Sequence, residues 1–168
     1  GRFAVSLTFD DGYRDNHDVV VPLLRDFGMS GTFYVATTAL TSGRGLWISE
    51  LWRLVPRLPD GRLDWPDPAP QHVPSHRDQA ARVTFRRQAT SWLASLTATD
   101  REHALDLLAA RAGVPRGDGL AHSFLTPELV LAMRRAGMTI GAHTQSHPHL
   151  DLLAPAGHDA EVAGSQRD

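Results

Sequence analysis

The beginning of the chain alternates between apolar, strand-like segments and one helix-like segment, and this order limits the fold more than any other feature. Residues 3–9 form a nearly continuous apolar run, which predicts a strand buried on both faces, as in a parallel sheet. Residues 19–27 favour a helix, with Pro22 in its first turn and Gly28 just beyond its end. Residues 32–36 are typical of a second strand. Together these segments predict a right-handed βαβ unit with parallel strands.

Two adjacent carboxylates, Asp10 and Asp11, follow the first expected strand and precede Gly12. Such neighbours repel each other unless a cation or a shared proton relieves them. Because side chains alternate along a strand, the two carboxylates point in different directions and can hold different roles. The alternative is an ordinary solvated turn, since Asp-Gly pairs often form turns. Taken alone, the pair favours neither interpretation.

The middle of the chain predicts a mostly helical insertion from residue 46 to residue 123. Residues 37–46 are rich in Thr, Ser and Gly and predict a loop, and the proline-rich residues 56–76 predict an irregular linker. Apolar residues at helical spacing predict three helices, over residues 46–55, 78–97 and 99–111. The last of these begins with Thr99–Glu102, which has the form of a capping box. The insertion has no paired carboxylates and no histidines at ligand spacing, so we expect no second catalytic domain there.

A second polar motif, His143-Thr144-Gln145-Ser146-His147-Pro148, follows another helix and strand. Residues 126–137 predict a helix that begins with Thr126 as N-cap, and residues 138–142 predict a short strand that ends at His143. In α/β folds, active sites lie on loops after the carboxyl ends of strands. Imidazole and carboxylate are ordinary zinc ligands, and a catalytic zinc site has three protein ligands and one position for water. Asp11, His143 and His147 are therefore candidate metal ligands, and two loop histidines without a metal are the alternative.

The segments Thr8-Phe9-Asp10-Asp11-Gly12 and His143–Pro148 resemble, in this order, the first two motifs of the polysaccharide deacetylases. This is the NodB-like group, also called carbohydrate esterase family four. The flanking residues 31–35 and 137–143 resemble the family as well. The resemblance implies an α/β fold, a distorted (β/α) barrel that is incomplete in this chain. It also implies one catalytic domain over residues 1–168, interrupted by the insertion at 46–123.

The resemblance further implies a role for each motif residue. Asp11, His143 and His147 would hold a divalent metal, most simply Zn²⁺, with Co²⁺, Ni²⁺ or Fe²⁺ as alternatives. Asp10 would be the general base, and Thr144 would support the loop. The expected reaction is hydrolysis of an N-acetyl or O-acetyl group. For an N-acetyl group, the bond broken is a carbon–nitrogen bond that is not a peptide bond. The expected substrate is an acetylated glycan or a lipid-linked sugar.

The resemblance does not extend to the later family motifs, which supply an arginine, an aromatic wall and an acid histidine. We therefore expect the chain to be the N-terminal part of a longer protein, with the general acid outside it. Two other functions stay open at this point. One is a non-catalytic metal- or sugar-binding relic, and the other is a metallohydrolase that acts on a different amide or ester.

Composition bears on partners and location. The chain has 168 residues, of which 42% are hydrophobic, and this fits one ordinary domain. A formal net charge of -2 gives no electrostatic reason to expect a nucleic acid, and Arg82, Arg86 and Arg87 favour a solvated helix face. No apolar run approaches the roughly 20 residues that a membrane-spanning helix needs. The absence of cysteine excludes disulfides. The family resemblance implies a location in the cell envelope or outside the cytoplasm, while a cytoplasmic location and any oligomeric state stay open.

Overall fold

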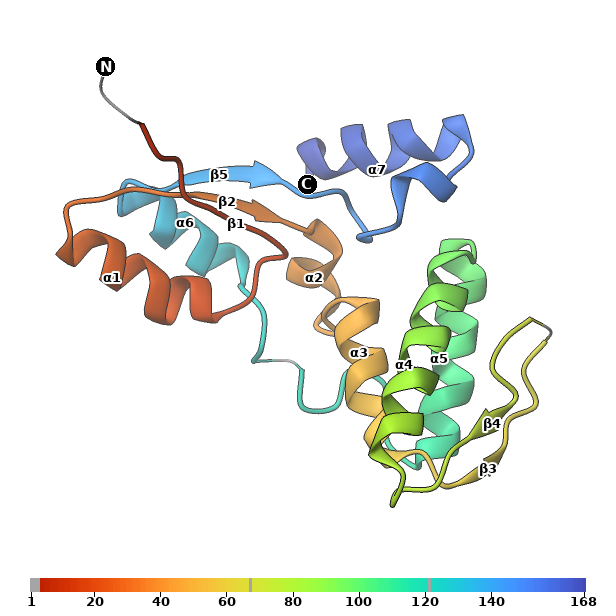
Figure 1. Cartoon of the computed structure of the whole chain (residues 1–168). Coiled ribbons are helices and arrows are strands. Elements are labelled where there is room, and N and C mark those ends of the chain that lie inside the picture. Colours follow the sequence, from red (N-terminus) through yellow and green to blue (C-terminus); the bar gives the residue numbers. More distant parts are fainter. Residues whose placement is uncertain (1–3, 67, 121) are drawn as a thin grey trace. The chain divides into compact units, whose positions relative to one another are not determined.

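The computed structural model describes residues 4–66, 68–120 and 122–168. The chain divides into two compact units (Figure 1). The first unit contains the ranges Gly1–Leu46, Gly119–His147 and Ala154–Asp168, and the second contains Trp47–Asp118 and Pro148–Leu153. No helix among the described residues is long and apolar enough to cross a membrane.

The first unit is built on a parallel sheet of three strands in the order β1-β2-β5. Its strands are β1 (Thr8–Phe9), β2 (Thr32–Val35) and β5 (Thr139–Ala142), and its helices are η1 (Asn16–Val20, π-helical), α1 (Val21–Asp26), α2 (Thr37–Ser42), α6 (Pro127–Arg135) and α7 (Pro155–Arg167). The central strand pairs Thr32 with Thr8 on one side and with Thr139 on the other. The predicted parallel βαβ arrangement of the first two strands is thereby confirmed.

One face of this sheet carries the core of the first unit. Phe33 and Val35 of β2 are buried with Val21 and Leu24 of α1 and with Met133 of α6. The opposite face is more open, since the Tyr34 side chain between them is 37% exposed. Burial on both faces was predicted for the strand at residues 3–9, and that prediction was wrong, since Thr8 is exposed and Phe9 is only partly buried.

The first strand is also shorter than the sequence predicts. Only Thr8 and Phe9 pair with β2, and Val5 is 82% exposed. Apolar alternation marked residues 3–9 as a strand, of which Phe3 lies outside the described residues. The paired part of β2 begins at Thr32, opposite Thr8, and the last ladder bond on this side runs from the Thr32 N–H to the Leu7 carbonyl oxygen. The described strands form an open sheet, and the fold is mixed α/β.

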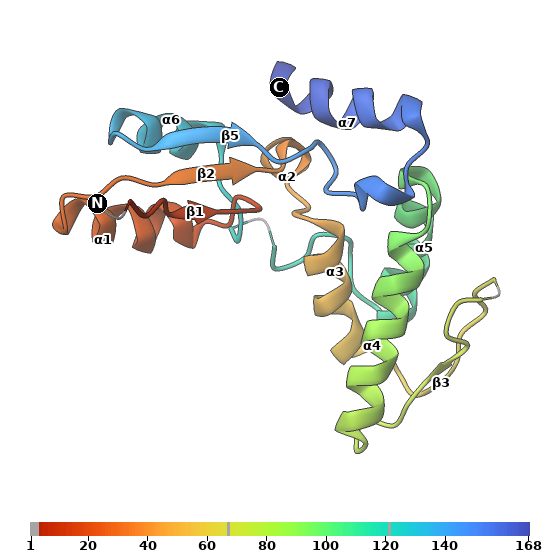
Figure 2. The same cartoon turned by 45° about the horizontal axis from the view of Figure 1, so that its top comes forward.

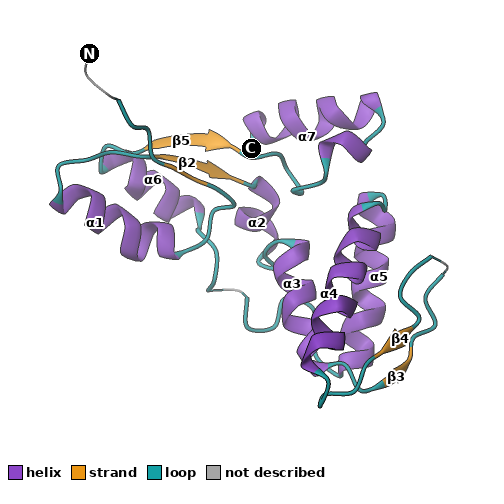
Figure 3. Cartoon of the chain, viewed as in Figure 1, coloured by secondary structure: helices purple, strands orange, loops and turns teal. Residues whose placement is uncertain are grey.

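The second unit is mostly helical, as Figure 3 shows. Its elements are α3 (Trp47–Leu54), η2 (Val55–Arg57, a 3-10 helix), β3 (Gly61–Arg62), β4 (His72–Val73), α4 (Gln79–Ala94), α5 (Ala98–Ala112) and η3 (Leu150–Leu152, also 3-10). Helices α3, α4 and α5 bury an apolar core that includes Leu51, Phe85 and Leu105. The helices expected near residues 46–55, 78–97 and 99–111 are present.

Three local predictions were wrong. Residues 37–46 were expected to be a loop, yet α2 occupies Thr37–Ser42. The expected irregular linker over 56–76 contains the antiparallel pair β3 and β4. Helix α5 begins after Thr97, whose hydroxyl accepts a hydrogen bond from the Asp100 N–H, so the cap lies two residues before the predicted one.

Arg82 lies inside the second unit, not on a solvated face. Its side chain is only 7% exposed and donates hydrogen bonds to the carbonyl oxygens of Val55, Leu58 and Pro74. It also pairs with Asp60 at 2.9 Å. A single guanidinium thus satisfies the backbone of the turn that follows α3, because its several N–H donors point in different directions.

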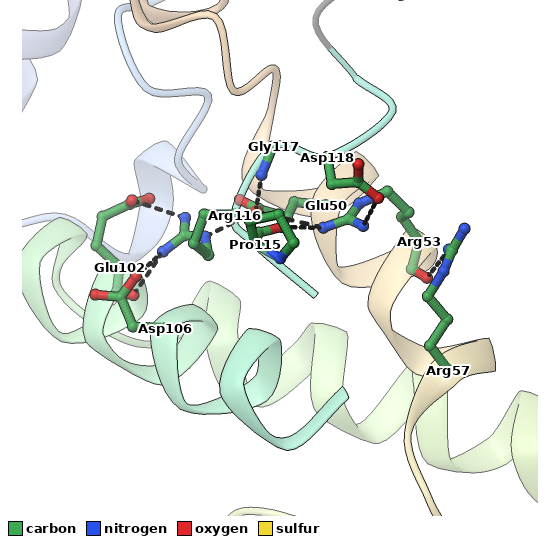
Figure 4. A network of polar contacts seen from close by, with 9 residues as sticks. All are labelled: Glu50, Arg53, Arg57, Glu102, Asp106, Pro115, Arg116, Gly117 and Asp118. Atoms are coloured by element: carbon green, nitrogen blue, oxygen red, sulfur yellow. Dashed lines mark hydrogen bonds and ion pairs between the residues drawn. The ribbon is translucent and has the colours of Figure 1, made fainter. Parts of the chain in front are cut away.

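A second polar network joins α3 and α5 to the segment 115–118 (Figure 4). At its centre Glu50 is 1% exposed and accepts a hydrogen bond from the Gly117 N–H at 2.7 Å. Arg116 lies 2.7 Å from Glu50 and also pairs with Glu102 and Asp106, at 2.8 and 2.7 Å. Burial alone would lower the pKa of Arg116, but the neighbouring carboxylates, Glu50 first among them, raise it above its ordinary value. The network places the buried carboxyl group of Glu50 beside the Arg116 guanidinium.

Candidate metal centre

The structure brings three of the sequence-predicted site residues together. One ligand atom each from Asp11, His143 and His147 lies within 4.8 Å of the others. Among the described residues, Asp11, His143 and His147 form the group of histidines and carboxylates that lie close enough together to hold a metal ion. The two imidazole rings are tilted with respect to each other, with their centroids 5.0 Å apart.

The sheet order explains why segments so distant in the sequence meet. Strands β1 and β5 flank β2 and run parallel to it, so their carboxyl ends lie at the same edge of the sheet. Asp11 follows β1 and His143 follows β5 directly. The His143 N–H donates to the Val35 carbonyl oxygen at 2.9 Å, which extends the pairing of β5 with β2 by one residue.

The turn that carries Asp11 is tight. Asp11 has φ 73° and Gly12 has φ 83°, both in the left-handed region. A Cβ atom on Gly12 would lie 2.6 Å from Cγ1 of Val35, so only glycine fits there. The Gly12 carbonyl oxygen accepts from the Leu125 N–H at 2.9 Å, and the ring of Tyr13 stacks on Phe124 with centroids 4.8 Å apart. The segment before α6 therefore fixes the turn from outside the sheet.

The loop that carries the histidines is also held by local bonds. The Thr144 hydroxyl accepts from the His147 N–H at 3.2 Å and donates to the His143 carbonyl oxygen. The first amides of α2 point at the same loop, since Thr37 and Thr38 donate to the carbonyl oxygens of Thr144 and Gln145, at 3.2 and 2.9 Å. These bonds close the loop between His143 and His147 and satisfy the end of α2.

The distances from Asp11 to the two histidines fit a small tetrahedral cation. Oδ1 of Asp11 lies 3.5 Å from Nε2 of His143 and 3.2 Å from Nε2 of His147. Ligand atoms in a tetrahedral zinc site, with bonds of about 2.0–2.1 Å, are roughly 3.3 Å apart. One carboxylate and two imidazoles also form a donor set that zinc accepts in known sites. The residues present therefore fit the metal that the motif suggested.

The electrostatics of the site favour a charged carboxylate. The contact with His147 lowers the pKa of Asp11 more than its partial burial raises it, and the charge of His143 adds to the lowering. Asp11 is therefore ionised well below neutral pH. A carboxylate anion next to two imidazole nitrogens attracts a divalent cation.

Asp10 lies beside Asp11 but outside the ligand group of the described residues. It is exposed at the end of β1, where its backbone carbonyl accepts from the Gly12 N–H at 2.9 Å. Asp11, in the left-handed turn after β1, lies beside the histidines, whereas Asp10 is exposed.

Sequence reasoning missed Glu161 of α7. This carboxylate accepts hydrogen bonds from the backbone of the histidine loop at Gln145 and Ser146. Helix α7 contains several polar residues, and neither their spacing nor their type distinguishes Glu161 from the others. Only the tertiary structure identifies its contact with the loop.

Comparison with known proteins agrees with the geometry. Neither the curated proteins nor the solved structures gave a match to this chain. A family model described as polysaccharide deacetylase matches residues 1–168, which is the whole sequence. With both polar motifs at one edge of a parallel sheet and this match over the full length, the chain belongs to the polysaccharide deacetylase family.

Proposed function

We propose that the chain carries the metal centre of a metal-dependent carbohydrate deacetylase, with Asp11, His143 and His147 as ligands. The observation that supports it most directly is the convergence of these three side chains within 4.8 Å in a chain that belongs to this family. The metal is proposed to be Zn²⁺, and Co²⁺, Ni²⁺ and Fe²⁺ suit the same donors.

The reaction we propose is hydrolysis of an N-acetyl or O-acetyl group on a glycan. A bound divalent metal supplies a water of lowered pKa and polarises the acetyl carbonyl. Asp10 is the proposed general base, because it is exposed beside the metal ligands and can accept the proton of the attacking water. The products are acetate and a free amine or hydroxyl on the sugar.

Substrate and location follow from family membership alone. We propose an acetylated glycan or a lipid-linked sugar as substrate and the cell envelope as the place of action. The whole sequence is proposed to be one deacetylase domain, with residues 46–123 as its insertion.

The test combines metal content with acetate release from N-acetylglucosamine oligomers, in the full-length protein as wild type, Asp11→Ala and Asp10→Asn. We expect one metal per wild-type chain, loss of metal in Asp11→Ala, and retained metal without acetate release in Asp10→Asn. Circular dichroism of each variant controls for folding.

Each component of the proposal has its own contrary outcome. Full acetate release by Asp10→Asn would exclude this residue as the base. Metal binding by a wild type that releases no acetate would contradict the deacetylase activity, and a folded wild type without metal would contradict the site itself.

A further inference from the structure

Glu161 of α7 binds the loop between His143 and His147 with both of its carboxylate oxygens. Its Oε2 atom accepts the backbone N–H groups of Gln145 and Ser146, at 2.9 and 2.8 Å. Its Oε1 atom accepts the hydroxyl of Ser146 at 2.6 Å. Both carboxylate oxygens thus hold the segment that joins the two candidate ligands.

The backbone of this loop needs such support. Thr144 has φ 63° and His147 has φ 57°, and a non-glycine residue adopts this left-handed conformation only at a cost in free energy. Backbone of this kind persists where its surroundings hold it in place. The consecutive amides of Gln145 and Ser146 lie between the two strained residues and converge on a single anion, as in other anion-binding nests. Glu161 supplies the negative charge that this arrangement requires.

Helix α7 contacts the loop with the same face at two further positions. Gly164 and Asp168 follow Glu161 by three and seven residues, which places all three on one side of the helix. A Cβ atom on Gly164 would lie 2.5 Å from Cδ of Gln145, so α7 and this side chain are in close contact. Asp168 accepts from Nε2 of Gln145 at 2.9 Å and from the Thr37 hydroxyl at 2.6 Å. Figure 2 shows α7 beside the carboxyl end of β5, where the loop begins.

We propose that Glu161 is a positioning residue of the metal centre. It acts through the backbone of Gln145 and Ser146 and holds the loop in the conformation that turns both imidazoles toward Asp11. This inference rests on the metal site proposed above. It adds that a carboxylate from α7 fixes the loop that carries two of the three ligands.

The test measures Zn²⁺ affinity by competition with a chromophoric chelator, for the wild type and for Glu161→Gln. The substitution keeps the size of the side chain but removes its charge and one of its two acceptor oxygens. We expect affinity about 10- to 100-fold weaker, the range typical of residues that orient metal ligands. Asp159→Asn is the matched control, because Asp159 is exposed on the same helix and the charge change is identical. It should bind Zn²⁺ as the wild type does.

A second measurement separates positioning from folding. The visible absorption spectrum of bound Co²⁺ reports ligand geometry, and we expect it to change in Glu161→Gln and to stay unchanged in Asp159→Asn. Ser146→Ala removes only the hydroxyl contact and is expected to weaken Zn²⁺ binding several-fold. If Glu161→Gln does not fold, Ser146→Ala decides the question.

The outcomes distinguish this inference from the proposed function. Wild-type Zn²⁺ affinity and an unchanged Co²⁺ spectrum in folded Glu161→Gln would overturn the role of Glu161 alone. The same result in Ser146→Ala would overturn it where Glu161→Gln is unfolded. A wild type that binds Zn²⁺ without deacetylase activity would overturn the proposed reaction and leave the role of Glu161 standing. A wild type that binds no Zn²⁺ would overturn both.

Discussion

Replacing Glu50 with glutamine is expected to destabilise the second unit, because its buried carboxylate balances a buried cation. Glu50 is 1% exposed, accepts the Gly117 N–H at 2.7 Å and lies 2.7 Å from the Arg116 guanidinium. The Arg116 side chain is itself only 11% exposed. Glutamine fills the same volume, so the change removes charge and leaves packing almost unaltered.

The size of the effect follows from what Arg116 keeps. Removing one partner of a buried ion pair costs roughly 3–5 kcal/mol. Arg116 retains Glu102 at 2.8 Å and Asp106 at 2.7 Å, and the glutamine oxygen can still accept from Gly117. We therefore expect Glu50→Gln to lower the free energy of unfolding by about 2–3 kcal/mol.

Tryptophan fluorescence during urea unfolding measures this loss specifically. The chain has four tryptophans, Trp47, Trp52, Trp65 and Trp92, and all belong to the second unit. Glu102→Gln is the matched control, because it removes a carboxylate from the same arginine where the side chain is 48% exposed. An exposed pair contributes at most about 1 kcal/mol. The reasoning is refuted if Glu50→Gln costs no more than Glu102→Gln at an unchanged m-value.

Two further predictions concern a backbone constraint and a titration. Gly12→Ala should lower the free energy of unfolding of the first unit by about 2–4 kcal/mol, because the added methyl would lie 2.6 Å from Val35 and because residue 12 has φ 83°. Thermal unfolding followed by circular dichroism measures this loss, and an unchanged Tm would contradict it. Burial alone would raise the pKa of Asp60, but the hydrogen bonds from Arg82 and His76 and the smaller effects beside them together lower it. Its contribution to stability is therefore present above the unfolded value of about 3.9 and is lost as the pH falls through the lower folded value. Asp60→Asn should make urea unfolding less pH-dependent below about pH 4, and an equal loss of stability on acidification in the variant and the wild type would refute the assignment.

Local signals predicted the elements whose ends are fixed by their own residues. Helix α6 begins at Pro127 after the Thr126 cap, as expected, because the Thr126 hydroxyl accepts from the Leu129 N–H three residues on. The following strand, β5, lies within the predicted residues 138–142. Where the cap, the proline and the apolar spacing agree within one segment, the bounds of the helix can be predicted without knowledge of distant contacts.

Elements that depend on distant partners were predicted poorly. Helix α2 replaces the loop expected from its Thr- and Ser-rich sequence, and its Thr37 and Thr38 amides donate to carbonyl oxygens of the histidine loop. The sequence of α2 contains no sign of those acceptors. In the same way, the first strand begins only at Thr8, because β2 begins at Thr32, opposite Thr8, and the apolar pattern of residues 3–9 does not reveal where that partner begins.

The same division applies to the candidate site. The sequence by itself determined the donor types, since two carboxylates after one strand and two histidines after another are side chains typical of a divalent metal site. Only the tertiary structure decided that Asp11, His143 and His147 converge, because β2 lies between β1 and β5 and brings their carboxyl ends to one edge. It alone identified Glu161, since a carboxylate that binds backbone amides leaves no pattern of spacing in the chain. Donor types belong to individual residues and can be recognised in a sequence, whereas the distances between them arise from strand order and helix packing.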